Sequence, residues 1–298
     1  MHTGATQEHM KPKFNVPDSL KPYQRRVNAN GVGLHIYDSG ATSAQDITFL
    51  LIHGLGDEAD SWRQIFPLLM GRGRVVAPDL PGFGRSDHPR RAYTLTFFAD
   101  TVVALLENLK IPQAVLVGNS MGAAVALRVA GRRADLVARL VLVDGPPVRS
   151  KLGKVQMMFL IPGQGEKIYS SFRNSQDAAY ESLRPYYGNL DALSPEDRQF
   201  LRERVWDRVW SDDQRRAYFS TFRWMALEGL LGNPNPARLG RIQVPTTLVW
   251  GEQDLLIPVE AGKLLCSWIP GAELHLIPGC GHLPQQEKPQ ELARLILQ

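Results

Sequence analysis

A serine flanked by glycines is the pattern in this sequence best suited to nucleophilic chemistry. The segment Gly118–Gly122 (GNSMG) follows the apolar run Ala114–Val117 and precedes an Ala-rich stretch of helical period. Glycines two positions before and after Ser120 allow a tight turn from strand to helix, which pushes the serine side chain out at the end of a sheet. The start of the helix also favours developing negative charge. The alternative interpretation is an ordinary turn serine between glycines.

A serine nucleophile needs a base, and the base needs an acid that orients it. Of the seven histidines, His282 lies in a glycine-containing loop just after the last predicted strand. Asp254 follows the preceding predicted strand, so the chain order Ser120, Asp254, His282 is one in which serine hydrolases carry these groups. Asp144 also ends a predicted strand and is the rival acid, whereas we expect His53 to shape its own loop.

Two backbone N–H groups are candidates for binding an oxyanion. The run at 53–56 (HGLG) ends an earlier predicted strand, and its glycines let the chain aim the N–H of Leu55 at a developing negative charge. The N–H of Met121, directly after the serine, is the expected second donor. The alternative for the first loop is an ordinary strand-end turn. The sequence has no phosphate-binding glycine fingerprint and no His/Cys/Asp cluster with ligand spacing, so we expect no nucleotide, metal or other cofactor.

Short apolar runs that end at turn residues predict the strands that position these groups. They lie at 47–52, 74–77, 114–117, 140–143, 246–250 and 273–277. Helical periodicity occurs between them, at 94–109, 120–130, 259–268 and 289–297. Continuous apolar strands that alternate with helices predict an α/β fold with a mostly parallel central sheet and helices on both faces.

The alternation stops over 148–241, which we expect to form a helical cap inserted after the sixth strand of the sheet, the one predicted at 140–143. Helices are predicted there at 195–209 and 212–230, and no strand pattern occurs. Of the 25 aromatic residues, 13 lie in 151–240, which favours a cap that buries its own core and also lines an apolar acyl pocket. The candidate pocket residues are Trp206, Trp210, Phe219, Phe222 and Trp224.

Composition sets the remaining expectations. Residues 1–26 are polar and are predicted to form a leader, 27–147 and 242–298 the core, and 148–241 the cap. The 298 residues are 44% apolar and 21% charged, which is typical of a globular protein. The net charge of +4 comes without a run of like charges, so we expect no nucleic-acid partner, and no apolar stretch suits an integral membrane segment. Two cysteines and a leader without an apolar signal region favour a cytoplasmic location, although a signal peptide removed earlier would leave the same sequence.

Taken in order, the motifs resemble those of the α/β-hydrolase superfamily. They are HGLG at 53–56, DLPGFGRS at 79–86, GNSMG at 118–122, WGEQD at 250–254 and GH at 281–282. The resemblance implies a Ser–His–Asp hydrolase with a lid over its active site. Haloalkane dehalogenases and epoxide hydrolases of this superfamily carry an aspartate at the elbow, so Ser120 disfavours those two activities.

From these residues and this resemblance we expect a carboxylic ester hydrolase, esterase- or lipase-like, that forms an acyl-enzyme with a small-molecule ester of apolar acyl part. The elbow and Cys280–His282 also resemble carbon–carbon bond hydrolases of aromatic ring-cleavage pathways. Those enzymes have a longer glycine-rich oxyanion loop than the one at 54–56 here. They also have an arginine in the cap that engages the substrate, and in this chain Arg202 or Arg204 would supply that cation. A third alternative is a ligand-binding receptor with a slow triad. The sequence leaves the oligomeric state open.

Overall fold

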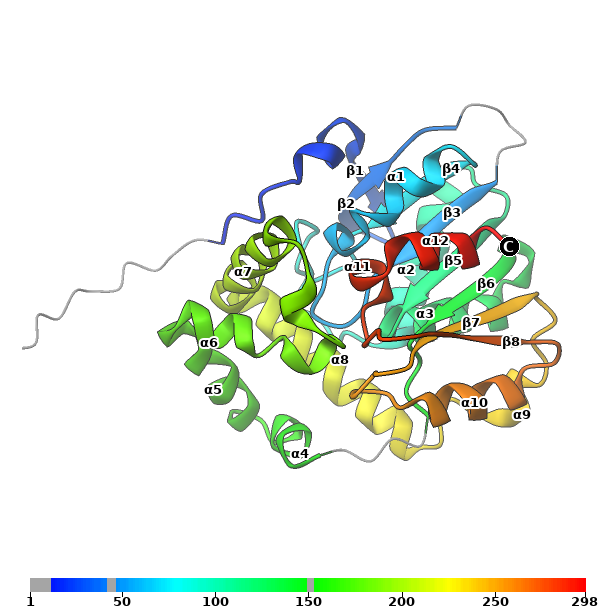
Figure 1. The fold of residues 1–298 in the computed structure, drawn as a ribbon. Coiled ribbons are helices and arrows are strands. Elements are labelled where there is room, and N and C mark those ends of the chain that lie inside the picture. The colour runs from blue at the N-terminus through cyan, green and yellow to red at the C-terminus, as the bar shows by residue number, and fades with distance from the viewer. Residues whose placement is uncertain (1–11, 42–46, 149–152) are drawn as a thin grey trace, which may run out of the picture.

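Eight strands form one sheet in the computed structural model, which describes residues 12–41, 47–148 and 153–298 (Figure 1). In spatial order they are β1 (Gln24–Ala29), β2 (Val32–Asp38), β4 (Arg74–Pro78), β3 (Thr48–Ile52), β5 (Ala114–Asn119), β6 (Val137–Val143), β7 (Thr246–Gly251) and β8 (Glu273–Ile277). The pairs β1/β2 and β2/β4 are antiparallel, and the other five pairs are parallel. The predicted mostly parallel sheet is therefore confirmed, and the six predicted strands lie on β3 to β8.

Alternating side chains of the central strands build a separate core on each face of the sheet. On β3, Leu50 and Ile52 belong to one core, and Phe49 and Leu51 belong to the other. The first core includes α2 (Leu95–Asn108), α3 (Met121–Arg132) and α10 (Val259–Trp268), and the second includes α1 (Ile65–Met70) and α12 (Pro289–Ile296). Burial on both faces explains why these strands are continuous apolar runs in the sequence. Helices on both faces are as predicted.

The chain leaves the sheet after β6 and returns at β7, and helices fill the interval (Figure 1). They are α4 (Lys154–Leu160), α5 (Gln164–Ser171), α6 (Gln176–Glu181), α7 (Pro195–Trp210), α8 (Asp212–Leu230) and α9 (Pro236–Leu239). Hydroxyls of Ser194 and Ser211 accept backbone N–H bonds at the starts of α7 and α8, the usual N-cap role of serine. The described part of this interval holds no strand, and no described helix is both long and apolar enough to cross a bilayer. The helical insertion after the sixth strand is thus confirmed.

The N-terminal segment lies against the insertion and then joins the sheet. The backbone N–H groups of Lys13 and Phe14 donate to the two carboxylate oxygens of Asp207 on α7, each at 2.9 Å. Residues 24–29 then pair as strand β1 with β2. Residues 12–26 of the predicted polar leader are therefore packed against the rest of the protein. Residues 1–11 lie outside the described residues.

Buried ion pairs join the insertion to the core. Arg208 of α7 donates to the two oxygens of Glu58 at 2.7 and 2.9 Å and also contacts Asp57. One turn earlier, Arg204 pairs with Asp60 at 2.5 Å and with Glu58 at 3.2 Å. Burial raises the pKa of Glu58 to about 7 even though both arginines act to lower it. The two arginines therefore offset much of the cost of desolvating these acids.

Candidate active site

Ser120 lies at the turn between β5 and α3. Its backbone has φ 53° and ψ −113°, which residues with a Cβ rarely adopt and which costs about 1–3 kcal/mol. A Cβ on Gly122 would lie 2.1 Å from the carbonyl oxygen of Ile52, and one on Gly118 would lie 2.3 Å from that of Gly122. Because only glycine fits both positions, the strand and the helix approach closely and present the serine at the end of the sheet.

The loop after β3 lies directly against this serine. A Cβ on Gly54 would be 3.4 Å from the Cβ of Ser120 and 3.1 Å from Oδ1 of Asn119, and Leu55 follows Gly54 in the loop. Met121 is the first residue of α3, so its N–H has no acceptor within the helix. The structure therefore places the loop of Leu55 and the first residue of α3 against Ser120, and the binding of an oxyanion by these two N–H groups stays a prediction.

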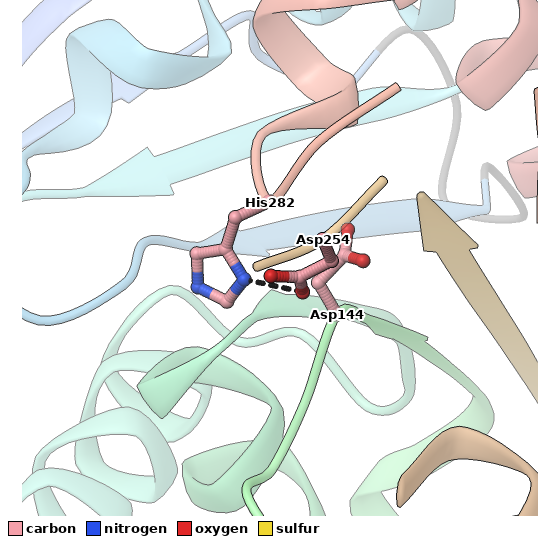
Figure 2. A group of neighbouring side chains, drawn as sticks. All are labelled: Asp144, Asp254 and His282. Carbon is pink, nitrogen blue, oxygen red and sulfur yellow. Dashed lines mark hydrogen bonds and ion pairs between the residues drawn. The ribbon is translucent and has the colours of Figure 1, made fainter. Parts of the chain in front are cut away.

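His282 and Asp254 form a buried hydrogen-bonded pair in the loops after β8 and β7 (Figure 2). Nδ1 of His282 lies 2.7 Å from Oδ2 of Asp254. The other carboxylate oxygen accepts from the backbone N–H groups of Leu256 and Ile257 at 2.8 and 3.0 Å, which fixes the carboxylate. The amide of Asn119 donates to the carbonyl of His282 at 3.1 Å. With Nδ1–H directed at the acid, Nε2 is left to accept a proton from a serine hydroxyl.

A second carboxylate, that of Asp144, lies beside Asp254 at the end of β6 (Figure 2). Its side chain is fully buried, and Oδ1 accepts from the N–H of Gly251 at 2.8 Å. Burial and the charge of Asp254 raise the pKa of Asp144 well above its ordinary value. Since Asp254 makes the contact with His282, the geometry favours Asp254 among the two rival acids.

These three side chains are also close enough to offer ligands to a metal ion. One ligand atom from each of Asp144, Asp254 and His282 lies within 4.8 Å of the other two. The oxygens of Asp254, however, already accept from His282 and from two backbone amides. A cation among these atoms would have to displace those donors, so we interpret the group as an acid–base pair with a neighbouring acid.

His53 and Asp79 organise the loops around the site. Nδ1 of His53 lies 2.8 Å from the carbonyl of Gly54, and Nε2 accepts from the N–H of Leu80 at 2.9 Å. Asp79 accepts from the N–H of Ala59 at 2.7 Å. Both ring nitrogens of His53 are thus occupied, which matches the loop-shaping role expected for it.

Four of the five predicted pocket aromatics line hollows on the insertion or pack within it. Trp206 and Trp210 contact each other with ring centroids 5.8 Å apart, and Trp206 lines a hollow of about 510 Å³ next to residues 13–18. Phe219 and Trp224 line another hollow of about 630 Å³ along α8. Neither hollow includes a residue of the predicted triad or oxyanion pair among its lining residues.

Two tyrosines that the sequence analysis does not single out lie beside the predicted catalytic groups. A Cβ on Gly56 would be 2.9 Å from the ring of Tyr218, and Phe222, the fifth predicted aromatic, stacks on Tyr218 with centroids 6.4 Å apart. The ring of Tyr186 lies 6.2 Å from that of His282. Both tyrosines come from the insertion, so their position depends on tertiary packing that no spacing in the sequence reveals.

Glu287 on α11 (Pro284–Glu287) is a further residue without a sequence signal. Its carboxylate accepts from the N–H of Gly281 at 2.8 Å and from that of Gly188 at 2.9 Å. The N–H of His282 also donates to the carbonyl of Tyr186 at 2.8 Å. These bonds fasten the histidine loop to the loop of the insertion that carries Tyr186.

Comparisons with known proteins agree with this geometry. The alpha/beta hydrolase fold family matches residues 47–289. A 2-hydroxymuconate semialdehyde hydrolase of Pseudomonas sp. (strain CF600) is 30% identical over 287 residues, which cover 95% of each chain. A 2-hydroxy-6-oxononadienedioate/2-hydroxy-6-oxononatrienedioate hydrolase of Pseudomonas putida is 30% identical over 276 residues, 89% of this chain and 90% of the relative.

A solved structure shows the same architecture. A serine hydrolase involved in carbazole degradation superposes with a TM-score of 0.76 and 26% identity, over 92% of this chain and 96% of the other. The family match spans the sheet from β3 onwards together with the insertion, and it includes the elbow and the loops of Asp254 and His282. The chain therefore belongs to the α/β-hydrolase fold family, as a serine hydrolase.

Proposed function

We propose that this protein hydrolyses a carbon–carbon bond of a 2-hydroxy-6-oxodienoate, the class of compound to which 2-hydroxymuconate semialdehyde belongs. The observation that carries the proposal is the similarity along nearly the whole chain to two hydrolases named for such substrates. The hydrogen-bonded Asp254–His282 pair supports it, since the histidine loop is bonded to Asn119, the residue before the elbow serine. This order reverses the expectation from the sequence, in which ester hydrolysis comes first.

In the proposed reaction Ser120 adds to the 6-oxo carbonyl carbon of the keto form of the substrate while His282 takes the hydroxyl proton. Asp254 holds the imidazole and stabilises the imidazolium. The N–H groups of Leu55 and Met121 bind the tetrahedral oxyanion. When this intermediate collapses, the carbon–carbon bond breaks, and its electron pair stays on the departing carbon, which takes the proton from His282. Water then hydrolyses the acyl-serine and releases a carboxylic acid.

Carboxylic ester hydrolysis is a second candidate, because the two arginines suggested as substrate anchors are occupied. Arg202 pairs with Asp177, and Arg204 is buried between Glu58 and Asp60. A dienoate substrate carries a carboxylate that needs a hydrogen-bonded or charged partner once it leaves water. A simple ester carries no such charge, and the same serine, histidine and oxyanion donors suffice for it.

Phenol groups of the insertion near the site are candidate polar partners for either substrate. Tyr169 and Tyr218 have ring centroids 5.7 Å apart, and Tyr186 lies against His282. Enclosure by the protein raises the pKa of all three hydroxyls, that of Tyr169 to about 12. They therefore stay neutral donors across the physiological pH range, able to bind a carbonyl or a carboxylate oxygen.

A paired assay separates the two candidates. Purified protein is given 2-hydroxymuconate semialdehyde, followed by its loss of absorbance, and in parallel a panel of p-nitrophenyl esters of graded acyl length. We expect a higher kcat/KM for the semialdehyde, and a loss of about 10⁴-fold or more in kcat for both substrates in Ser120→Ala. A higher kcat/KM for an ester would replace the proposal with ester hydrolysis. Slow turnover of both classes, with ligand-dependent binding of a partner, would favour a receptor.

A further inference from the structure

One carboxylate oxygen of Asp144 takes no part in the hydrogen bonds of the Asp254–His282 pair. Its side chain is 0% exposed, and Oδ1 is occupied by the N–H of Gly251. Oδ2 is buried and has no hydrogen-bond partner among the described residues, although a ligand atom of Asp144 lies within 4.8 Å of atoms of both Asp254 and His282. A buried polar atom without a partner carries a desolvation cost, so its protonation state matters.

Two of the groups that face Asp144 are acids, Asp254 and Glu287, and both are unfavourable to a second negative charge. Asp254 comes from the loop after β7, Glu287 from α11, and His282 and Cys280 from the loop after β8. No lysine or arginine pairs with Asp144 in the described part of the chain, whereas Asp254 has His282 and two backbone amides as donors. Two neighbouring carboxylates without a cation do not both ionise. The negative charge is therefore better stabilised on Asp254, which has more hydrogen-bond donors, in keeping with the raised pKa of Asp144.

We propose that Asp144 is a positioning residue, a neutral carboxylic acid whose Oδ2–H donates a hydrogen bond to the carboxylate of Asp254 and thereby helps to orient His282. A protonated acid has one O–H donor, which gives the buried oxygen the partner it otherwise lacks. The chain of hydrogen bonds then runs from the end of β6 through the end of β7 to the histidine loop. The inference rests on the triad of the proposed function, but not on which substrate that triad cleaves.

A neutral Asp144 has two consequences for the histidine. Its O–H adds a further donor to the Asp254 carboxylate, besides His282 and the two backbone amides. The carboxylate therefore stays aligned with Nδ1 of His282. It also keeps the net charge beside the imidazole at one negative unit. An ionised Asp144 would instead add a second negative charge beside the imidazole and favour its protonated form over the neutral base.

Two substitutions separate these effects without disturbing the backbone. Asp144 has φ 45°, a conformation that asparagine and glycine both tolerate. In Asp144→Asn the amide N–H replaces the acid O–H as donor to Asp254, whereas Asp144→Gly removes the donor. We expect the asparagine variant to keep most of the wild-type kcat with an unmoved acid limb of kcat/KM. The glycine variant should lose about tenfold in kcat, with KM little changed.

The readouts are chosen to be independent of the physiological substrate. Rates are measured for p-nitrophenyl acetate and for covalent labelling of Ser120 by a fluorophosphonate, across pH. Equal losses in both variants, or no loss in either, would overturn the positioning role. An acid limb that moves to lower pH in Asp144→Asn would show that the wild-type residue is ionised. Failure on the semialdehyde alone would instead count against the proposed function.

Infrared spectroscopy tests the protonation state directly, even if the glycine variant does not fold. The difference spectrum between wild type and Asp144→Asn at pH 7 should contain the C=O stretch of a protonated carboxylic acid. Because Glu58 is present in both proteins, its own carboxyl cancels in the difference. Absence of that band, with a carboxylate band in its place, would overturn the proposal.

Discussion

At the scale of single residues, local backbone donors decide which of two neighbouring acids is the charged one. Asp254 receives two backbone N–H bonds on the oxygen that does not face His282, because the chain turns immediately after β7. Asp144 receives one such bond, from Gly251. Hydrogen bonds to the ionised form stabilise it, so the difference in donors directs the negative charge to the acid that contacts the histidine.

Replacement of the acid that contacts the histidine tests this assignment. Asp254→Asn should lower kcat by about 10⁴-fold, because an amide can present its N–H to Nδ1 and stabilise the wrong imidazole tautomer. The fold should be retained, since the amide oxygen can still accept from Leu256 and Ile257. The measurement is kcat on one substrate, with near-UV circular dichroism to check folding. If Asp254→Asn kept its activity while Asp144→Asn lost it, the acid would lie at the end of β6 instead.

The sequence could predict these groups because each is tied to a local pattern. Ser120 stands between two glycines, and Asp254 and His282 each follow an apolar strand, so their order and spacing are visible along the chain. Tyr186 and Tyr218 have no such pattern. They reach the site only because the insertion folds back over the sheet, and the phase of a helix alone does not reveal which of its faces that packing presents.

At the scale of elements, burial of both faces of a strand explains which strands could be predicted. The central strands β3, β5 and β6 are buried on both faces and therefore appear as apolar runs. Strand β1 (QRRVNA) is an edge strand with most of its side chains exposed, so it resembles a loop in composition. No strand is therefore predicted at β1. Strand β2 (VGLHIYD), which pairs with β1, is buried but is not predicted either, because Gly33 and His35 interrupt its apolar run.

Close packing of α3 against the sheet gives a prediction with a matched control on the same helix. In Gly122→Ala the new Cβ would meet the carbonyl oxygen of Ile52 at 2.1 Å, so helix and strand must separate. We expect a loss of about 3 kcal/mol in unfolding free energy and about 10²-fold in kcat, since the elbow moves with the helix. Gly131→Ala, whose Cβ would meet nothing within 4 Å, should instead stabilise the protein by about 0.5–1 kcal/mol.

Chemical denaturation and steady-state kinetics on both variants check this pair. Similar small effects on stability and kcat in the two variants would mean that the elbow tolerates a wider separation than the structure shows. The comparison is clean because both substitutions add one methyl group to α3 and change no charge.

At the scale of the whole molecule, the buried ion pairs between α7 and the core hold the insertion over the sheet. Arg208→Met should cost about 3–5 kcal/mol, because it leaves Glu58 buried with one arginine fewer. Arg202→Met on the same helix removes a pair with the exposed Asp177, and it should cost less than about 1 kcal/mol. Thermal unfolding of both variants measures the difference. Equal costs would mean that the insertion is held mainly by its apolar contacts.

Stability against acid is a second property of the whole molecule, and it follows from carboxylates that the fold keeps ionised. Burial acts to raise the pKa of Asp79, but hydrogen bonding and charge from His35 and the charge of Arg85 outweigh it and hold that pKa well below the ordinary value of 3.8. Burial likewise opposes Arg74 and Arg25 at Asp38, whose pKa is also lowered. In the unfolded chain both groups take up protons at higher pH than in the folded protein.

The unfolded state therefore binds more protons below about pH 4, and stability must fall there as the pH falls. We expect the unfolding free energy to be nearly independent of these two groups above about pH 5. Below about pH 4 it should decrease by about 1.4 kcal/mol per pH unit for each additional proton that the unfolded state takes up. Urea unfolding between pH 2 and pH 6 measures this slope. In Asp38→Asn the slope should be smaller by the contribution of one carboxylate, and the unfolding free energy at neutral pH should be lower than that of the wild type. A variant as stable as wild type at pH 6 with an unchanged acid slope would show that Arg74 contributes no net stability through Asp38, and that the acid sensitivity arises elsewhere in the fold.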